Sequence, residues 1–195
     1  MKEILLTQGK VALVDDEDYE WLNQWKWYFG TGYANRGINI GRSNGKQKSV
    51  KVAMHRLIMN VTDSKLHIDH INFDGLDNRK ENLRLATVSQ NSRHKRPCQN
   101  AKSKYLGVFQ CNMTGNWRAV IELQGKKIYG GSFTREEDAA WAYNKLSLKY
   151  FKEFAYQNSL PNWADGSSKK VFSCTIPGIS WDKSKSKWSA SVRRK

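Results

Sequence analysis

The chain has 195 residues, of which 39% are hydrophobic and 12% aromatic, a composition that suits several small modules better than one large core. Its 33 Lys and Arg outnumber 18 Asp and Glu and give a formal net charge of +15, so a polyanion is the expected partner. No apolar run approaches the roughly 20 residues of a bilayer span, and the N-terminus lacks the apolar segment of a signal peptide. We therefore expect an intracellular, cytoplasmic protein with no membrane partner.

Cysteine usage supports the same compartment. The chain contains three cysteines, Cys98, Cys111 and Cys174, and no two of them are close in sequence. This spacing excludes a CxxC zinc pair and an even-numbered disulfide framework. Free thiols in a reducing compartment are the expected state.

The N-terminal residues predict a strand, a helix and a hairpin. The strand covers ILLTQGKVALVD, and Asp15 or Asp16 is placed to cap a helix running through WLNQWKW. Trp21, Trp25 and Tyr28 have the spacing i, i+4, i+7, which predicts a buried helical stripe; nucleotide stacking is the alternative. The Gly- and Asn-rich GTGYANRGINIGRSNGKQK predicts hairpin turns, and the alternating SVKVAM predicts a strand.

The segment IDHINFDGLDNRKEN, residues 68–82, gathers four acids in a basic chain. A solvated loop, a calcium loop and a metal-dependent site acting on phosphate are the three interpretations. An EF-hand would require an oxygen ligand at the position of His70, and the preceding LHI indicates a strand rather than a helix. The remaining calcium-loop spacing is met at Asn72, Asp74, Gly75 and Glu81.

The wider sequence around this segment predicts a small ββα unit. A strand over LHID ends at Asp69 and His70, the loop INFDGLDNRKE follows, and NLRLA returns as a second strand. Thr87 and Gln90 have the spacing of a capping box that begins a helix. Asn91 then lies in the first turn of that helix.

This unit resembles the HNH family of nucleases, a branch of the His-Me finger fold, over about residues 52–95. His70 matches the first His of the motif, Asn82 the middle Asn, and Asn91 the last position, which many members fill with His. Asp69 matches the acidic metal ligand. The resemblance implies that Asp69 and Asn91 bind one divalent ion, Mg²⁺ or Mn²⁺, with no zinc expected.

The residue types fit hydrolysis of a phosphodiester. Neutral His70 can accept a proton from water near neutral pH, and Asn82 is expected to hold the loop and to orient the imidazole by a hydrogen bond. Asp74, Asp77 and Glu81 are expected to serve only as turn and loop residues. Three further histidines have simpler expected roles: His55 packs beside the finger, His67 is structural, and His94 lies among cations and contacts phosphate.

Residues 103–158 predict three short strands and an amphipathic helix that buries Ala139, Ala140, Tyr143 and Leu146. The stretch resembles the APETALA/ethylene-response-factor type of DNA-binding domain in YLGV, WRAVI, GSF and EEDAAWAY. This resemblance implies a sheet that enters the major groove of double-stranded DNA. Expected DNA-binding residues, from this sheet and from the acid-free segment SRHKRPCQNAKSK, are Gln110, Asn112, Asn116, Arg118, Lys126, Lys127, Tyr129, Arg93, Lys95 and Arg96.

Part of this second module is repeated. Gly107 and Gly178, and likewise Trp117 and Trp188, are separated by the same interval, as expected of a duplicated unit whose second copy stops before its helix.

The expected fold class is α+β, in six segments: an N-terminal α+β module (1–51), the ββα-metal finger (52–95), a basic linker (96–102), the sheet-and-helix domain (103–158), a linker (159–174) and a partial second repeat (175–195).

Together these patterns predict a metal-dependent DNA endonuclease resembling homing or phage-borne HNH enzymes, acting in a bacterial or phage-infected cell. One active site per chain predicts nicking by a monomer, or double-strand cleavage by a DNA-induced dimer. The alternative is a sequence-specific DNA-binding protein with an inactive nuclease finger.

Overall fold

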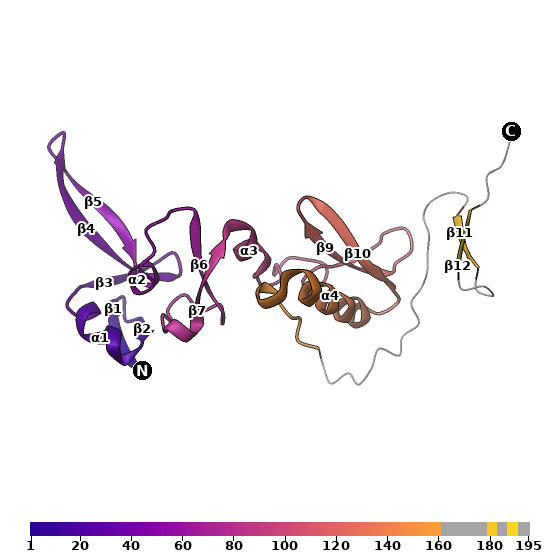
Figure 1. The fold of residues 1–195 in the computed structure, drawn as a ribbon, viewed down its shortest axis with the longest axis horizontal. Helices are drawn as coiled ribbons and strands as arrows, with labels where there is room; N and C mark the ends of the chain where they lie inside the picture. The colour runs from indigo at the N-terminus through magenta and orange to yellow at the C-terminus, as the bar shows by residue number, and fades with distance from the viewer. Residues whose placement is uncertain (161–178, 183–186, 191–195) are drawn as a thin grey trace. The chain divides into compact units, whose positions relative to one another are not determined.

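The computed structural model describes residues 1–160, 179–182 and 187–190. The chain divides into two compact units, Met1–Lys95 and Arg96–Lys195. Helices and several sheets are present, which confirms the mixed α+β class (Figure 1). No helix in the described part of the chain has the length and apolar character needed to cross a membrane.

Unit 1 combines a five-stranded sheet with a two-stranded ribbon. The sheet has the order β2-β1-β3-β4-β5, and the ribbon pairs β6 with β7. In chain order the elements are β1 (Lys2–Thr7), β2 (Val11–Val14), α1 (Asp16–Leu22), β3 (Trp27–Gly30), β4 (Tyr33–Ser43), β5 (Lys46–Ala53), α2 (Met54–Ile58), β6 (Leu66–His70), the 3₁₀ turn Lys80–Asn82, β7 (Leu83–Thr87) and α3 (Val88–Arg93).

One core joins the sheet of unit 1 to the β6–β7 ribbon. Ile68 and Leu83 of the ribbon pack with the buried Ile4, Val14 and other side chains of the N-terminal strands. The loop after β6 is also tied to the sheet, because the Leu76 carbonyl accepts a hydrogen bond from the Leu13 amide at 2.9 Å. The boundary expected after residue 51 therefore does not separate two cores.

The helix expected through WLNQWKW is wrong. α1 ends at Leu22, and Trp27 instead begins β3, where it is 1% exposed and donates its indole N–H to the Leu22 carbonyl at 2.9 Å. β3 pairs with β1 on one side and β4 on the other, so long-range pairing overrides the helical spacing. Trp21, Trp25 and Tyr28 remain substantially exposed and form no buried stripe.

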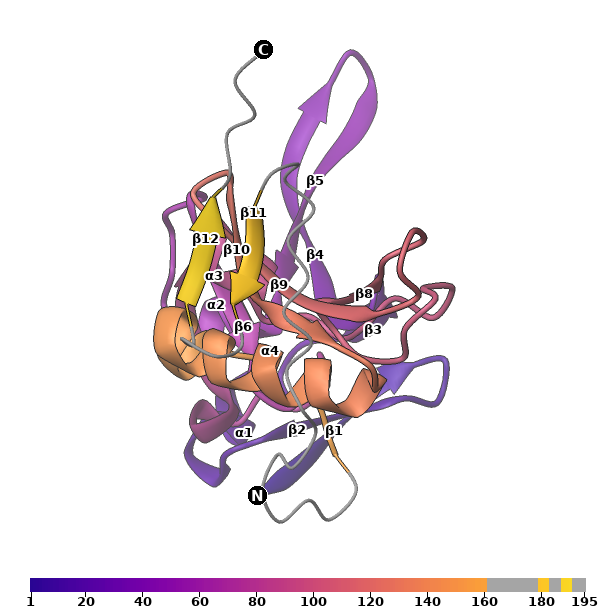
Figure 2. The same cartoon turned by 90° about the vertical axis from the view of Figure 1, so that its right-hand side faces the viewer.

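β4 and β5 form a long antiparallel hairpin that projects beyond the rest of unit 1 (Figures 1 and 2). Its turn is Asn44-Gly45, and both residues have positive φ angles, 50° and 73°, as a two-residue hairpin turn requires. A bulge between Asn39 and Gly41 interrupts the ladder, and Gly41 adopts a φ of 108° that a side chain disfavours. The hairpin expected from the Gly- and Asn-rich segment is therefore present, with most of that segment in its two strands.

Unit 2 contains a three-stranded antiparallel sheet with the order β10-β9-β8 and one long helix. Its elements are β8 (Val108–Gln110), β9 (Trp117–Leu123), β10 (Lys126–Phe133), α4 (Glu136–Phe151), the 3₁₀ turn Lys152–Phe154, β11 (Ile179–Asp182) and β12 (Lys187–Ala190).

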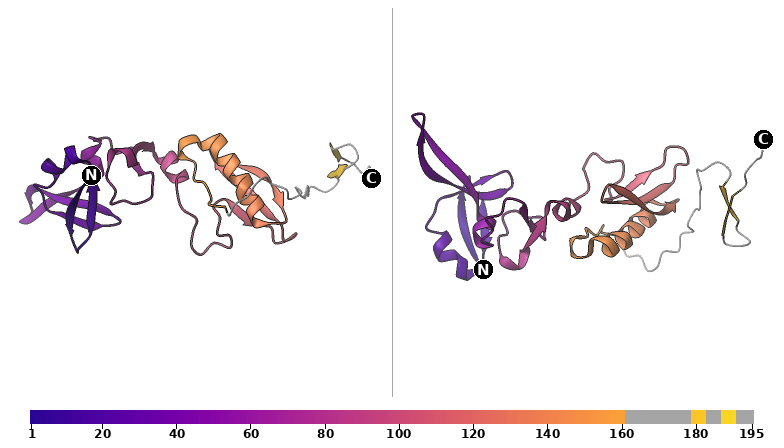
Figure 3. Two further views of the ribbon diagram at one scale, coloured as in Figure 1. Left: turned by 90° about the horizontal axis from the view of Figure 1, so that it is seen from below. Right: turned by 45° about the horizontal axis from the view of Figure 1, so that its top comes forward.

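α4 lies along one face of the β8–β10 sheet (Figure 3). Ala139, Ala140 and Tyr143 are buried against sheet residues, and Leu146 is partly buried, as their helical spacing predicted. The segment after α4 returns to the start of the domain, where the Asn158 amide bonds both the N–H and the C=O of Leu106, at 2.8 and 3.1 Å. These contacts close the domain around its own core.

The partial second repeat is described only in part. β11 and β12 pair antiparallel, with Trp181 opposite Trp188. The other residues of the predicted repeat (175–195) lie outside the described residues. So do Cys174 and residues 161–173 of the predicted linker.

Candidate active site

The β6–β7 ribbon carries Asp69, the expected metal ligand, and His70, the expected base, and their side chains lie on opposite faces of β6. The ladder pairs Asp69 with Arg84 and continues to His70 opposite Leu83. Because successive side chains of a strand alternate, Asp69 and His67 share one face while His70 shares the other with Ile68. β6 ends at His70 and the loop follows directly, as the sequence predicted.

The His70 ring packs against two other rings of unit 1. Its ring centroid is 5.6 Å from that of Tyr33 on β4 and 5.1 Å from that of His55 on α2, the latter in an edge-to-face arrangement at 89°. Tyr33 and His55 also contact each other, with centroids 5.1 Å apart. The three rings form one cluster, and His70 is only 5% exposed.

A glycine brings the loop against this cluster. A β-carbon at Gly75 would lie 2.3 Å from the Gly32 carbonyl oxygen and 2.7 Å from the Tyr33 ring. The close approach of Gly75 therefore lets the loop after β6 pack on the β3–β4 turn. Any larger residue at this position would push the loop away from Tyr33.

Two imidazole nitrogens of the cluster lack partners. His70 Nε2 and His55 Nδ1 are buried and have no hydrogen-bond partner among the described residues. A buried polar atom without a partner destabilises the fold by roughly 1–3 kcal/mol. Such atoms in a native structure point to a use that compensates the instability, such as proton transfer.

Burial keeps both imidazoles neutral. Desolvation lowers the pKa of His55 from 6.5 to about 4, with further lowering by the charges of His70 and Arg56. Desolvation also lowers the pKa of His70, although the Asn78 side chain and the charges of Asp69, Asp74 and Asp77 act in the opposite direction. Desolvation is the largest of these effects, so the pKa of His70 lies below its ordinary value. His70 is therefore an unprotonated base at neutral pH.

The opposite face of β6 is occupied by ion pairs. Arg84 contacts Asp69 Oδ2 through Nε at 2.8 Å and Nη2 at 2.6 Å, while His94 Nδ1 lies 2.9 Å from Oδ1. Phe73 stacks on the His94 ring with centroids 4.0 Å apart. The His94 side chain is 6% exposed, so its expected contact with phosphate among solvated cations is wrong.

α3 brings Asn91 to the same face. The predicted capping box is confirmed: the Thr87 hydroxyl accepts from the Gln90 amide at 3.2 Å, and the Gln90 side chain accepts from the Thr87 amide at 2.8 Å. The Asn91 amide nitrogen lies 3.4 Å from His67 Nδ1. Asn91 and Asp69 thus belong to the face between α3 and β6, each beside a histidine.

This face offers few but suitable metal ligands. No group of three or more His, Cys, Asp or Glu side chains in the described residues is arranged to hold a metal ion. Mg²⁺, however, keeps several waters and needs only one or two protein oxygens besides those of a phosphate. The Asp69 carboxylate and the Asn91 amide oxygen fit that requirement in type, with both Asp69 oxygens contacted by Arg84 and His94.

Asn82 uses its side-chain amide for hydrogen bonds within the loop. Its Oδ1 accepts from the Asn72 amide at 2.9 Å, and its Nδ2 donates to Asn72 Oδ1 at 3.0 Å and to the Asp77 carbonyl at 2.8 Å. The expected role in holding the loop is confirmed. The hydrogen bond expected between Asn82 and the imidazole is wrong, because the amide is used within the loop.

The other acids of the segment also stabilise the loop. Asp74 Oδ1 accepts from the Leu76 amide, and Asp77 pairs with Arg79, which holds the pKa of Asp77 below its usual value. Glu81 pairs with the same arginine. Their role as turn and loop residues agrees with the sequence prediction.

The expected DNA-binding residues of unit 2 do not all share one face. In the strand register, Arg118, Lys127 and Tyr129 alternate with core residues and so lie on the face away from α4. Gln110 pairs with Trp117 in the register of the helix-covered face and donates its amide to the Gly115 carbonyl. Lys126 is likewise exposed in that register. Asn112 and Asn116 lie in the turn between β8 and β9. In unit 1, Arg93 ends α3; Lys95 and, at the start of unit 2, Arg96 are exposed.

Four residues of the site were not predicted as functional. Tyr33, His55 and Asn78 surround His70, and Arg84 pairs with Asp69. Arg84 had a usable signal, since it stands directly opposite Asp69 in the two predicted strands. Tyr33 had none, because its approach to His70 depends on the packing of distant elements. His55 was expected only to pack beside the finger, and its contact with the His70 ring confirms that packing.

Comparison with known proteins now bears on this geometry. Residues 52–93 match the family described as HNH endonuclease. A viral protein from Acanthamoeba polyphaga mimivirus, described as an uncharacterized HNH endonuclease, is 29% identical over 153 residues, covering 78% of this chain and 77% of the relative. No solved structure matches the chain.

The chain therefore contains an HNH endonuclease domain, formed by α2, the β6–β7 ribbon and α3. The family match and the viral relative together support a nuclease, for which DNA is the implied substrate and a divalent metal the general requirement.

Proposed function

We propose that this protein is a metal-dependent endonuclease that hydrolyses phosphodiester bonds in double-stranded DNA at a recognised site. The observation that carries the proposal is the buried, neutral His70, whose Nε2 lacks a partner within the segment that matches the HNH family. A neutral imidazole nitrogen without a partner can accept the proton of an attacking water. His70 is thus the general base.

The neighbouring side chains keep the base in place. Tyr33 and His55 contact the His70 ring from β4 and α2, and the Asn82 hydrogen bonds fix the loop that follows it. Asp69 and Asn91 are the residues that would hold a divalent cation, Mg²⁺ or Mn²⁺. When bound, such an ion would supply a Lewis acid for the charge on the leaving oxygen. Arg84, beside Asp69, adds fixed positive charge on that face.

Recognition is assigned to unit 2. Arg118, Lys127 and Tyr129 lie on the sheet face that α4 leaves open, in keeping with the resemblance to APETALA/ethylene-response-factor domains. Arginine suits guanine in the major groove, and lysine suits phosphate. With one site per chain, a monomer nicks DNA and a DNA-induced dimer cuts both strands. The setting that fits such a chain is a homing or phage-borne nuclease.

Cleavage of supercoiled plasmid by the full chain tests the proposal. His70→Ala and His70→Asn should each reduce Mg²⁺- or Mn²⁺-dependent nicking by roughly 10²- to 10⁴-fold, because the proton acceptor is lost. Ile71→Ala, at an exposed neighbour in the same loop, is the matched control and should nick normally. His70→Asn keeps a polar side chain of similar size. It therefore tests the role of His70 even if His70→Ala does not fold.

DNA binding in EDTA separates the two candidate functions. Both His70 variants should bind DNA as the unaltered protein does, and EDTA should stop cleavage without stopping binding. Undiminished nicking by folded His70→Asn would remove His70 as the base. An unaltered protein that binds DNA but never nicks it would favour the alternative, a DNA-binding protein with an inactive finger.

A further inference from the structure

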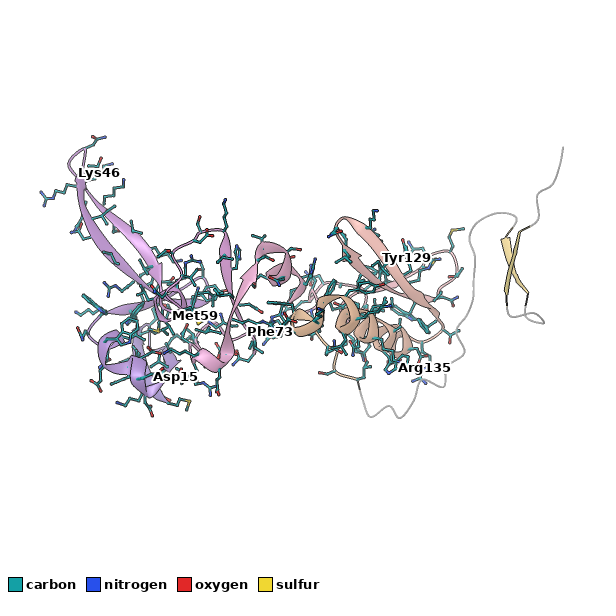
Figure 4. All side chains as sticks on the ribbon, in the orientation of Figure 1. Asp15, Lys46, Met59, Phe73, Tyr129 and Arg135 are labelled. Atoms are coloured by element: carbon teal, nitrogen blue, oxygen red, sulfur yellow. The ribbon has the colours of Figure 1, made fainter. Side chains whose placement is uncertain are left out.

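The outer part of the β4–β5 hairpin, residues 37–51, contributes no side chain to the ring cluster around His70. None of residues 37–51 is buried, and Lys46 lies near the far end of the hairpin (Figure 4). A two-stranded hairpin without a packed face is marginally stable in water by itself. The outer half of this hairpin therefore has no structural role in the core of unit 1.

The charge of the segment is one-sided. No Asp or Glu occurs between Glu20 and Asp63, whereas seven Lys and Arg do, five of them in β4 and β5. Because no acid of the hairpin offsets these cations, a partner of opposite charge is favoured. The complementary partner is a polyanion.

The register divides the exposed side chains into two faces. β5 alternates regularly, and β4 residues take the face of their cross-strand partners. We define the lysine face as Lys46 and Lys48 with the aliphatic pair Ile38 and Val50. We define the amide face by its five polar side chains: Asn39, Arg42, Gln47, Ser49 and Lys51.

Most groups on the amide face have hydrogen-bonding capacity to spare. Arg42, Gln47 and Ser49 make no side-chain hydrogen bond or ion pair with any described residue. Asn39 uses only its Oδ1, which accepts from the Gly41 amide at 3.0 Å, and Lys51 donates to Thr31 at 3.2 Å. An Arg and two amides side by side are the residue types that read guanine and adenine edges.

We propose that the β4–β5 hairpin enters the major groove of double-stranded DNA with its amide face toward the bases and its lysines on the phosphates. The major groove, about 12 Å wide, admits a two-stranded ribbon. The bulge at Asn39 and Gly41 adds local twist to the outer half of the ribbon. The inference rests on the proposed function for its substrate, and it assigns to unit 1 a share of sequence recognition separate from that of unit 2.

Selection from a random duplex library, done with the full chain in EDTA, tests this assignment. Arg42→Ala and Gln47→Ala should each relax the selected sequence at one or two positions, by roughly 5- to 150-fold in preference, as loss of a bidentate contact does. Lys46→Gln with Lys48→Gln is the matched control from the other face. It should weaken binding to all sequences alike and reduce the salt slope by about two.

Methylation interference identifies the groove. Methyl groups at guanine N7 lie in the major groove and those at adenine N3 in the minor groove. Interference at guanine N7 should be present for the unaltered protein and should disappear at one guanine in Arg42→Ala. Interference confined to adenine N3, or an Arg42→Ala variant with unchanged affinity, selected sequence and interference pattern, would overturn the inference.

These outcomes are independent of catalysis. If the unaltered protein nicks plasmid but the hairpin variants bind and select normally, the hairpin inference fails and the nuclease stands. If the hairpin variants lose selectivity while the unaltered protein never nicks DNA, the nuclease proposal fails and the hairpin contact stands.

Discussion

The two faces of the β6–β7 ribbon differ in how they treat a buried polar side chain, although the two residues concerned, Asp69 and His70, are adjacent in sequence. On one face, Asp69 is a buried carboxylate with both oxygens contacted, by Arg84 and by His94. On the other, His70 is a buried imidazole whose Nε2 has no hydrogen-bond partner among the described residues and whose ring packs against those of Tyr33 and His55. Compensation of its charge gives Asp69 a framework role beside its proposed role as a metal ligand, whereas the imidazole nitrogen of His70 that lacks a partner is available to accept a proton.

Substitutions on the Asp69 face and on the His70 face should affect different properties, the stability of the fold and the rate of cleavage. A residue whose charge is compensated should matter most to folding, because its removal leaves the buried charge of its partner uncompensated. A residue that lacks a partner should matter most to catalysis, because removing it leaves nothing else unsatisfied. Substitutions on the two faces should therefore have contrasting effects.

The largest effect on stability is expected from Asp69→Ala. The change removes the carboxylate that pairs with Arg84, which is 17% exposed, and loss of one member of a buried pair destabilises by about 3–5 kcal/mol. Urea unfolding in EDTA measures the loss without any contribution from a bound metal. Glu20→Ala removes an exposed carboxylate that pairs with Lys2 and should change the free energy of unfolding far less.

Asp69→Asn sharpens this prediction, since the amide keeps the size and one acceptor. It should recover part of the lost stability while still weakening binding of Mn²⁺, which electron paramagnetic resonance detects directly. An Asp69→Ala protein as stable as the unaltered one would mean that Arg84 finds other partners, and the framework role would be lost.

The ring cluster predicts a pH dependence of stability. The pKa of His55 is about 4 in the folded chain and 6.5 as its ordinary value, so below pH 6.5 the unfolded chain binds a proton that the folded chain does not. Stability is therefore full above about pH 6.5, falls as the pH drops toward 4, and levels off below. The whole change is about 3 kcal/mol, with His70 acting in the same direction.

Replacement of His55 isolates its share of this dependence. His55→Gln and His55→Phe should both flatten the profile of unfolding free energy between pH 6.5 and 4, because neither side chain titrates there. His55→Phe preserves the ring contact with His70 and should retain more nicking activity than His55→Gln. Equal pH profiles in all three proteins would show that His55 is accessible to protons in the folded state.

Local patterns in the sequence predicted the elements whose formation depends on near neighbours. The strands around Asp69 and Leu85, the Thr87 capping box and the buried face of α4 all follow from short-range spacing. The identities of Asp69, His70, Asn82 and Asn91 came from the motif. Each of these signals is contained within a few consecutive residues.

The remaining features depend on contacts between distant segments. Trp27 belongs to a strand because β1 pairs with it in parallel, and no local spacing reveals that pairing. His55 contacts His70 only because α2 and β6 meet in the folded unit. The separation of Asp69 and His70 onto two faces follows from one further ladder pair, His70 with Leu83, which decides where the strand ends.

The smallest expected effect concerns the cap of α3, and it tests how the Asp69 face is assembled. Thr87→Ala removes one side-chain acceptor of the capping box and should destabilise unit 1 by about 1 kcal/mol, whereas Thr87→Ser should be nearly neutral. Hydrogen exchange of the α3 amides should accelerate in the alanine variant alone. α3 has six residues and buries none of them, so the cap and the contacts of Asn91 with His67 and of His94 with Asp69 are expected to contribute to its stability. If exchange in Thr87→Ala is unchanged, the cap is not needed to hold α3 against β6.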